Sequence, residues 1–375
     1  MWPPPYRSLA ARATIAATVL LVTACEPATP SAGQTAASAS ASPPASTAEL
    51  AAVLGPGSSA SAPSVRPGVA DGDFPAAPAS GILGAGVADK VVAAGRAPTV
   101  RLVEPGAEPR APLAYALAKG ARVPLGMSLD MTMGVKNADR AVQPTAIPRL
   151  ALTLDMTTGD VDAKGDAHVD AKLTRVAVEP SGAAQAAMAD ALRPAMDGLK
   201  GFALSYRVSA SGRVHDLVAK APADAPRASA QILGGVSQSF EAMVAPLPSE
   251  PVGVGARWRV VSRVSAAGPD LLQLATYTLT AREGGKAVLD VTLTQVAASE
   301  RVQTPGLPDG VTARVRRFRS SGRGVTRLDL ASVAPESGTM TVESAMDVEV
   351  AQGSAPGQST TAESTLRVEF SRPAK

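Results

Sequence analysis

The sequence predicts an α+β fold of mostly antiparallel β-structure, in which long curved strands form a half-barrel-like sheet with two inserted helices. Three observations support this prediction. After Thr99 apolar and polar residues alternate with a period of two, glycine-containing turns separate the alternating runs, and two stretches carry apolar residues at helical spacing. Helices placed within a run of strands favour one α+β domain over separate modules.

The first residues have the features of a targeting segment. Arg7 and Arg12 precede an uncharged, mostly apolar run over residues 13–24, which is shorter than the about 20 residues that a membrane-spanning helix needs. The run ends in Leu21-Val22-Thr23-Ala24-Cys25. We therefore set residues 1–24 apart as a signal peptide.

This ending resembles the bacterial lipobox, in which an aliphatic residue and two small residues precede a cysteine that accepts a diacylglycerol. A secretory peptide with a chance cysteine, or an uncleaved anchor helix, is the alternative. Lipidation is favoured because Cys25 is the only cysteine in the 375 residues. The resemblance implies a lipoprotein held on the membrane by palmitate-type acyl chains on Cys25. Glu26 stands where inner-membrane lipoproteins of the enteric type carry aspartate, which implies an outer-membrane location facing the periplasm.

Composition divides the rest of the chain in two. Residues 25–98 are dominated by Ala, Ser, Pro, Gly and Thr, which lack the large side chains needed to offset backbone ordering, so we expect a disordered tether. Within it, the apolar piece 81–94 is expected to form a transient helix or to contact the domain. Residues 99–375 are expected to be the β-rich globular domain. A net charge of +3 and 3% aromatic residues argue against nucleic acid as a partner.

Alternating runs predict the strands in order. They are residues 127–133, 150–156, 168–176, 274–279, 287–296, 340–350 and 365–370. Glu283-Gly284-Gly285-Lys286 predicts a short hairpin connection between two of them. Helical spacing predicts one helix over 181–199, shortened or kinked by Pro194, and a second over 226–244 that ends before Pro246.

Several motifs resemble an uncharacterised family of bacterial envelope proteins. They are Leu113 to Gly120, similar to an opening strand, the turn Val161-Asp162-Ala163-Lys164-Gly165, and the junction from Leu247 to Trp258 between a helix and the next strand. The family has no established activity. Its arrangement is similar to the open half-barrel of lipoprotein carriers, an analogy of fold alone.

Two sets of side chains are candidate binding sites. Arg314, Arg316, Arg317 and Arg319, followed by Arg323 and Arg327, form the densest charge in the chain. They indicate either a solvated strand and turn, which could be a sheet edge protected by charge, or a contact with anionic lipid phosphates. The stripe Met127, Met131 and Met133 indicates either core packing or a hydrophobic groove for an acyl chain.

Catalytic and metal-binding readings find little support. Asp160, Asp162 and Asp166 imitate a calcium loop, but Lys164 occupies a ligand position and the closing carboxylate is absent. His168 and His215 are isolated from any nucleophile motif, and Asp216 should point away from His215 in a strand. We therefore expect no enzyme, no metal and no cofactor.

The sequence thus predicts an outer-membrane-anchored lipoprotein with a non-catalytic binding domain, a carrier of a hydrophobic ligand in its sharper form. The alternative is a structural module that docks on an envelope protein or peptidoglycan. A hydrolase is disfavoured because no nucleophile motif accompanies the two histidines.

Overall fold

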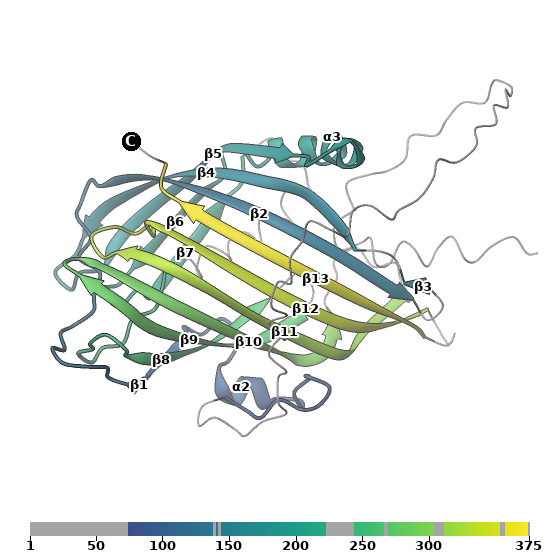
Figure 1. The fold of residues 1–375 in the computed structure, drawn as a ribbon, viewed down its shortest axis with the longest axis horizontal. Coiled ribbons are helices and arrows are strands. Elements are labelled where there is room, and N and C mark those ends of the chain that lie inside the picture. The colour runs from purple at the N-terminus through teal and green to yellow at the C-terminus, as the bar shows by residue number, and fades with distance from the viewer. Residues whose placement is uncertain are drawn as a thin grey trace, which may run out of the picture.

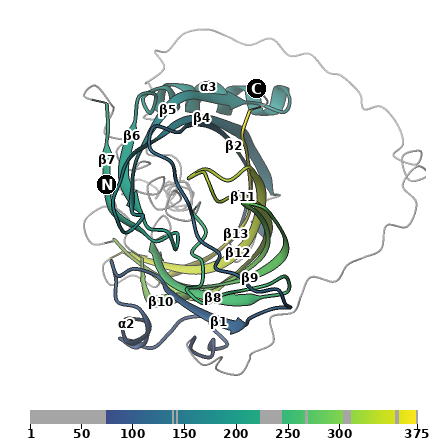
Figure 2. The ribbon, with the colours of Figure 1, turned by 90° about the vertical axis from the view of Figure 1, so that its left-hand side faces the viewer.

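A computed structural model describes residues 74–137, 140–141, 144–222, 244–265, 269–302, 311–352 and 357–373. Within these residues one large antiparallel sheet curls around an interior without closing into a barrel (Figures 1 and 2). The predicted fold class, mostly antiparallel β with a half-barrel-like sheet, is therefore confirmed.

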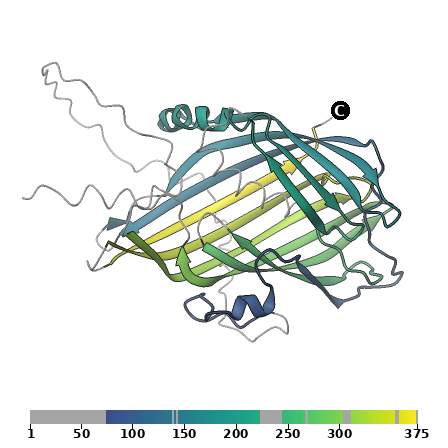
Figure 3. The same cartoon turned by 180° about the vertical axis from the view of Figure 1, so that it is seen from behind.

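The sheet has thirteen strands, most of them long. They are β1 (Thr99–Glu104), β2 (Arg122–Asn137), β3 (Arg140–Ala141), β4 (Thr145–Val161), β5 (Ala167–Glu179), β6 (Ala203–Val208), β7 (Val214–Lys220), β8 (Arg257–Ser265), β9 (Pro269–Glu283), β10 (Lys286–Val302), β11 (Val311–Asp329), β12 (Ser337–Gln352) and β13 (Gln358–Ser371). Twelve follow the order β1-β8-β9-β10-β11-β12-β13-β2-β4-β5-β6-β7, and β3 pairs with β2. Strands β1 and β7 are the two edges, on the side of the molecule seen in Figure 3.

The alternating runs of the sequence all lie within these strands. The predicted hairpin joins β9 to β10, with Glu283 and Lys286 paired and Gly284 at φ 56°. This left-handed conformation is the one that a tight hairpin turn requires and that glycine adopts without strain.

The two faces of the sheet differ in character. On the inner face, which is the concave side, Leu125, Leu154 and Leu289 are at most 1% exposed and belong to one core that runs across the sheet. On the outer face the same strands carry mainly hydroxyl and charged side chains, such as the Arg149–Asp130 pair joined by two hydrogen bonds of 2.8 and 2.6 Å. The period of two thus separates an apolar interior from a polar exterior.

Three irregular segments pack across one end of the curled sheet (Figure 2). They are residues 105–118, 244–256 and 329–336, which contribute Leu113, Tyr115, Val244, Leu247 and Val333 to the core. The backbone N–H of Tyr115 donates to Ala210 O at 2.8 Å, and its hydroxyl donates to Ala245 O at 3.4 Å. The opening strand that the resemblance implied from Leu113 is not formed, because residues 112–118 belong to no strand and the N–H groups of Tyr115 and Ala116 donate to Ala210 O and Leu330 O.

Helix α3 (Ala183–Asp197) confirms the first predicted helix. It contacts β5 and β4, buries Ala189, Ala195 and Met196, and contains Pro194. The second predicted helix, over 226–244, falls almost entirely outside the described residues. Neither described helix has the length and apolar composition needed to cross a membrane.

Residues 74–92, here called the N-terminal insert, pack against the sheet. They include helix α2 (Val87–Val91), which lies outside the curl beneath β8 to β10 (Figures 1 and 2). Phe74, Leu83, Ala88 and Val92 bury themselves against outer-face residues of β8 to β10, namely Val261, Leu272, Val296 and Ala298. The folded part therefore begins before Thr99, because the expected tether supplies the apolar cover for this patch.

The insert also enters the sheet itself. Backbone pairing of β10 with β11 stops after Gln295 and Ser320 and resumes at Arg301 and Arg314. Ser80 to Leu83 occupy the interval. The Leu83 N–H donates to Ala297 O, the Ala297 N–H to Gly81 O, and the Phe318 N–H to Ser80 O, at 2.8 to 2.9 Å. Residues 80–83, which are distant in sequence, thus fill the interval between β10 and β11.

Candidate ligand-binding site

The inner face changes along the strands from fully buried to half-buried. Near the packed end, Leu125 and Leu154 are buried, whereas farther along β2, β12 and β13 the apolar residues are only half-buried. The half-buried set is Leu129, Met131, Met133, Val135, Met340, Val342, Met346, Val348, Val350, Ala362, Leu366, Val368 and Phe370. We call this set the apolar inner face.

Strand register makes the apolar inner face continuous. Leu366 pairs with Met131 on one side and Val342 on the other, and Val368 pairs likewise with Leu129 and Met340. Side chains opposite each other on adjacent strands are about 5 Å apart, so these rows touch. Apolar surface that is only half-buried among the described residues favours an apolar occupant.

The structure places the predicted methionines on this face. Met127 lies in the buried core at 9% exposure, while Met131 and Met133 are half-buried members of the apolar inner face. Met156, Met196 and Met340 approach the same core from β4, α3 and β12. The alternation in the sequence correctly predicted that Met127, Met131 and Met133 share one face of the sheet.

The arginine cluster lies on β11, whose outer face carries Arg314, Arg317 and Arg319 opposite β12. Arg316 sits at a bulge, with Nε 2.7 Å from Glu349 Oε2 and Nη1 3.6 Å from Glu300 Oε2. Arg317 Nε is 3.7 Å from Asp347 Oδ2. A hydrogen bond from Arg316 lowers the pKa of Glu349. The cluster thus lies on a solvated strand, but not at a sheet edge, because β11 lies between β10 and β12. Acidic side chains on β10 and β12 pair with Arg316 and Arg317.

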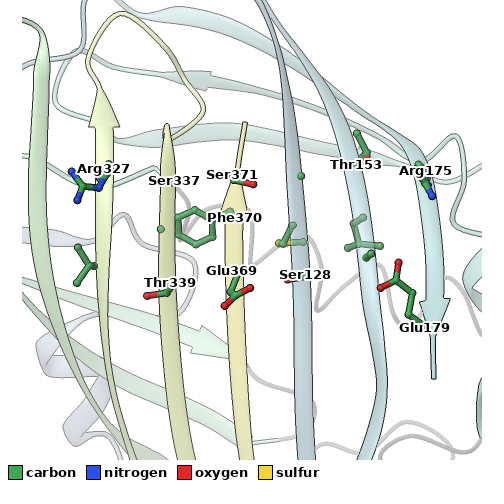
Figure 4. A pocket seen from close by; sticks show the side chains of 16 residues that line it. Ser128, Thr153, Arg175, Glu179, Arg327, Ser337, Thr339, Glu369, Phe370 and Ser371 are labelled. Atoms are coloured by element: carbon green, nitrogen blue, oxygen red, sulfur yellow. The ribbon is translucent and has the colours of Figure 1, made fainter. Parts of the chain in front are cut away.

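An open hollow of about 680 Å³ lies on the outer side of β11 to β5 (Figure 4). Arg327 and Arg175 stand at its two ends, with Glu369 and Glu179 among the hydroxyls of Ser128, Thr153, Thr339, Ser337 and Ser371. Its lining also includes the apolar Ala151, Val325 and Phe370. Because it is open and carries charges of both signs, as solvated sheet faces do, we do not assign a ligand to it.

The remaining candidate residues make structural contacts. Asp162 accepts hydrogen bonds from the backbone N–H groups of Asp166 and Lys164, which lower its pKa, and it pairs with Arg207. His168 Nε2 lies 3.2 Å from Ser205 Oγ. Among the described residues no group of three or more His, Cys, Asp or Glu is placed to hold a metal ion.

His215 departs from the expected strand geometry. Asp216 has φ 55°, so its carboxylate lies 3.8 Å from His215 Nδ1 instead of on the opposite face. Asp166 lies 3.4 Å from Nε2. The part of the chain that the structure describes brings no serine or threonine hydroxyl into a hydrogen bond with this imidazole.

Comparisons with known proteins do not identify a function, so any functional assignment depends on the residues described above. No family model matches the chain, and no curated protein matches it. Among solved structures, Rv2717c from M. tuberculosis is 10% identical and covers 66% of this chain and 92% of its own, with a TM-score of 0.18. OccK11 (OpdR) of Pseudomonas aeruginosa is 7% identical over 68% of this chain and 99% of its own, with a TM-score of 0.16. The P. putida toluene transporter TodX is 10% identical over 69% of this chain and 91% of its own, with a TM-score of 0.13. Scores this low carry no inference.

Proposed function

We propose that the chain is a lipoprotein of the bacterial cell envelope, anchored in the outer membrane through Cys25, whose domain binds a hydrophobic ligand without catalysis. The observation that carries the proposal is the apolar inner face, a continuous set of half-buried side chains on the concave side of an open sheet. Its chemistry fits alkyl chains, because the half-buried residues are aliphatic or thioether with one phenylalanine.

The free energy gained by burying an alkyl chain on this face is large enough for measurable binding. Each buried methylene contributes about 0.8 kcal/mol, so a chain of about fourteen methylenes gains roughly 11 kcal/mol. Lost translational and rotational freedom costs at least about 4 kcal/mol. The remainder corresponds to a Kd in the micromolar range, which suits a carrier that must also release its cargo.

Ligand binding is tested on the chain without its first 25 residues, which retains every described residue. We expect native mass spectrometry to find a co-purifying lipid, and a fluorescent alkyl probe to bind. Met131→Glu should weaken probe binding at least tenfold, because a carboxylate on the apolar inner face must lose hydration when an alkyl chain covers it. Thr132→Glu, next in sequence but on the outer face, is the matched control and should bind as the parent does. Equal affinities for the two variants, with both folded by circular dichroism, would contradict the proposal.

Membrane attachment gives a second prediction. Cys25→Ser removes the thiol that would carry the acyl chains, so the protein should move from the membrane fraction to the soluble fraction of the envelope. Fractionation followed by immunoblotting measures this, with the parent chain alongside. A serine variant that is processed normally and stays with the membranes would end the anchoring part of the proposal.

The alternative, a module that docks on an envelope protein or peptidoglycan, is favoured by the open edges of the sheet. Val100 and Val103 on β1 and Val218 on β7 are 37 to 51% exposed, and both edge strands leave backbone groups unpaired by the sheet. A ligand-free chain that does not bind the alkyl probe would support this reading over the carrier.

A further inference from the structure

A row of uncharged polar side chains crosses the apolar interior of the sheet. It consists of Ser262 on β8, Gln273 on β9, Gln295 on β10, Ser320 on β11, Ser344 on β12 and Ser364 on β13, and we call it the polar row. Each member is the register partner of the next. Six adjacent strands at about 4.8 Å give the row a length of about 24 Å.

The polar row lies on the inner face. Ser262 follows the buried Trp258 and Val260 at intervals of two along β8, and Gln295 follows Val291 and Leu293 in the same way along β10. Same-face residues in a strand recur at every second position, so the polar row points to the concave side. Ser320 is 6% exposed, and the other five are half-buried.

Hydrogen bonds link most of the row. Gln273 Nε2 donates to Ser262 Oγ at 3.4 Å, and Gln295 Nε2 donates to Gln273 Oε1 at 2.9 Å. Ser320 Oγ donates to Gln295 Oε1 at 2.6 Å. The hydroxyls of Ser344 and Ser364 are 2.7 Å apart.

This network leaves hydrogen-bond donors over. Each glutamine amide has two N–H groups, and within the described residues Gln273 and Gln295 each use one. In the Ser344–Ser364 pair one hydroxyl donates to the other, so among the described residues the second O–H group also remains without an acceptor. These spare donors can bind an oxygen acceptor placed on the concave side.

The surroundings exclude a charged partner. On one side the row is flanked along its strands by Val260, Ala275, Leu293, Gly322, Val342 and Leu366, and on the other by Val264, Leu271, Ala297, Phe318, Met346 and Ala362. None of these neighbours is charged. A phosphate or carboxylate brought here would lose its hydration without meeting a cation, which is costly.

We propose that the polar row binds the ester or hydroxyl oxygens of a neutral lipid whose alkyl chains lie on the apolar inner face. The ligand class is therefore an uncharged ester-bearing lipid, such as an acylglycerol, and not a phospholipid. This inference rests on the proposed function and specifies its ligand. A polar row that only stabilised the sheet would have no need of spare donors, because valine or leucine at these positions would pack without leaving any polar group to satisfy. The spare donors therefore favour ligand binding over a purely structural role.

The test compares methyl palmitate, hexadecane and an anionic phospholipid as competitors of a fluorescent alkyl probe bound to the chain without its first 25 residues. We expect the ester to bind at least about tenfold more tightly than the alkane, as one or two good hydrogen bonds allow. In Gln273→Leu/Gln295→Leu this preference should fall to about one while hexadecane binds as before. Thr276→Leu/Thr292→Leu, a register pair on the outer face of the same strands, should keep the preference.

Each outcome separates the two proposals. If the parent chain binds neither the probe nor any competitor, the carrier function itself is overturned. If it binds alkane and ester equally, or prefers the anionic phospholipid, the polar-row inference is overturned and the carrier function stands. Should the double leucine variant not fold, Ser344→Ala/Ser364→Ala, which removes only two hydroxyls, must lower the ester preference for the inference to survive.

Discussion

Replacing Gly81 with alanine should lower the free energy of unfolding by about 3 kcal/mol. Gly81 has φ +70°, where a residue with a Cβ is strained by about 1–2 kcal/mol, and a Cβ there would overlap the carbonyl oxygen of Phe318. The backbone must then shift, which weakens the bonds that Ser80 to Leu83 make to Ala297 and Phe318. Urea denaturation monitored by circular dichroism measures the change.

Gly84→Ala is the matched control for this substitution. Gly84 is three residues farther along the same segment, its φ is not in the left-handed region, and the nearest atom to an added Cβ is Val87 Cγ2 at 3.7 Å, an ordinary contact. Its stability should therefore stay within about 0.5 kcal/mol of the parent. Equal stabilities for the Gly81 and Gly84 variants would mean that the N-terminal insert is not held between β10 and β11.

The fold was largely predictable because its long strands are half-buried. In Met127 to Met133 and Ala287 to Val296 every second residue faces the core, and the period of two is a local property that a single sequence displays. The Gly284-Gly285 turn was equally local. Strand β11 was harder, because its arginines dominate the pattern and its place between two neighbours depends on pairing with residues far away.

The N-terminal insert was only partly predictable, for the same reason: the apolar piece 81–94 was expected to form a transient helix or to contact the domain, but not to enter the sheet. Its Ala, Gly and Pro content is that of a tether, and only the patch around Val261 and Leu272 gives its few apolar residues something to bury against. Gly81 offered a signal only in retrospect, since a glycine that enters a sheet cannot be told from one in a loop by sequence alone.

The candidate ligand-binding site was half predictable. The alternation placed Met127, Met131 and Met133 on one face, but not the neighbouring rows from β12 and β13. The polar row was out of reach, because its six members come from six strands and meet only through register. The sequence around a lone glutamine such as Gln295 does not show which residues of the neighbouring strands it will hydrogen-bond.

Truncating Trp258 should produce the other large loss of stability. Its side chain is fully buried, its ring stacks on Tyr277 with centroids 5.6 Å apart and planes at 8°, and its Nε1 donates to Pro246 O at 2.8 Å. Trp258→Ala leaves a cavity and an unpaired carbonyl, so the free energy of unfolding should fall by about 3–5 kcal/mol. Trp258→Phe, which keeps a ring against Tyr277, should lose less than half as much.

A titration provides a readout that general destabilisation does not mimic. Burial raises the pKa of Tyr277 to about 12, so in the parent this phenol ionises well above the ordinary value of 10. A cavity at Trp258 admits water beside the ring, and the pKa of Tyr277 in the folded variant should move back toward 10. Spectrophotometric titration of Trp258→Ala against Trp258→Phe measures this. If the two variants titrate alike, Trp258 does not keep water from Tyr277. The packing of the two rings then stabilises this end of the sheet less than their geometry implies.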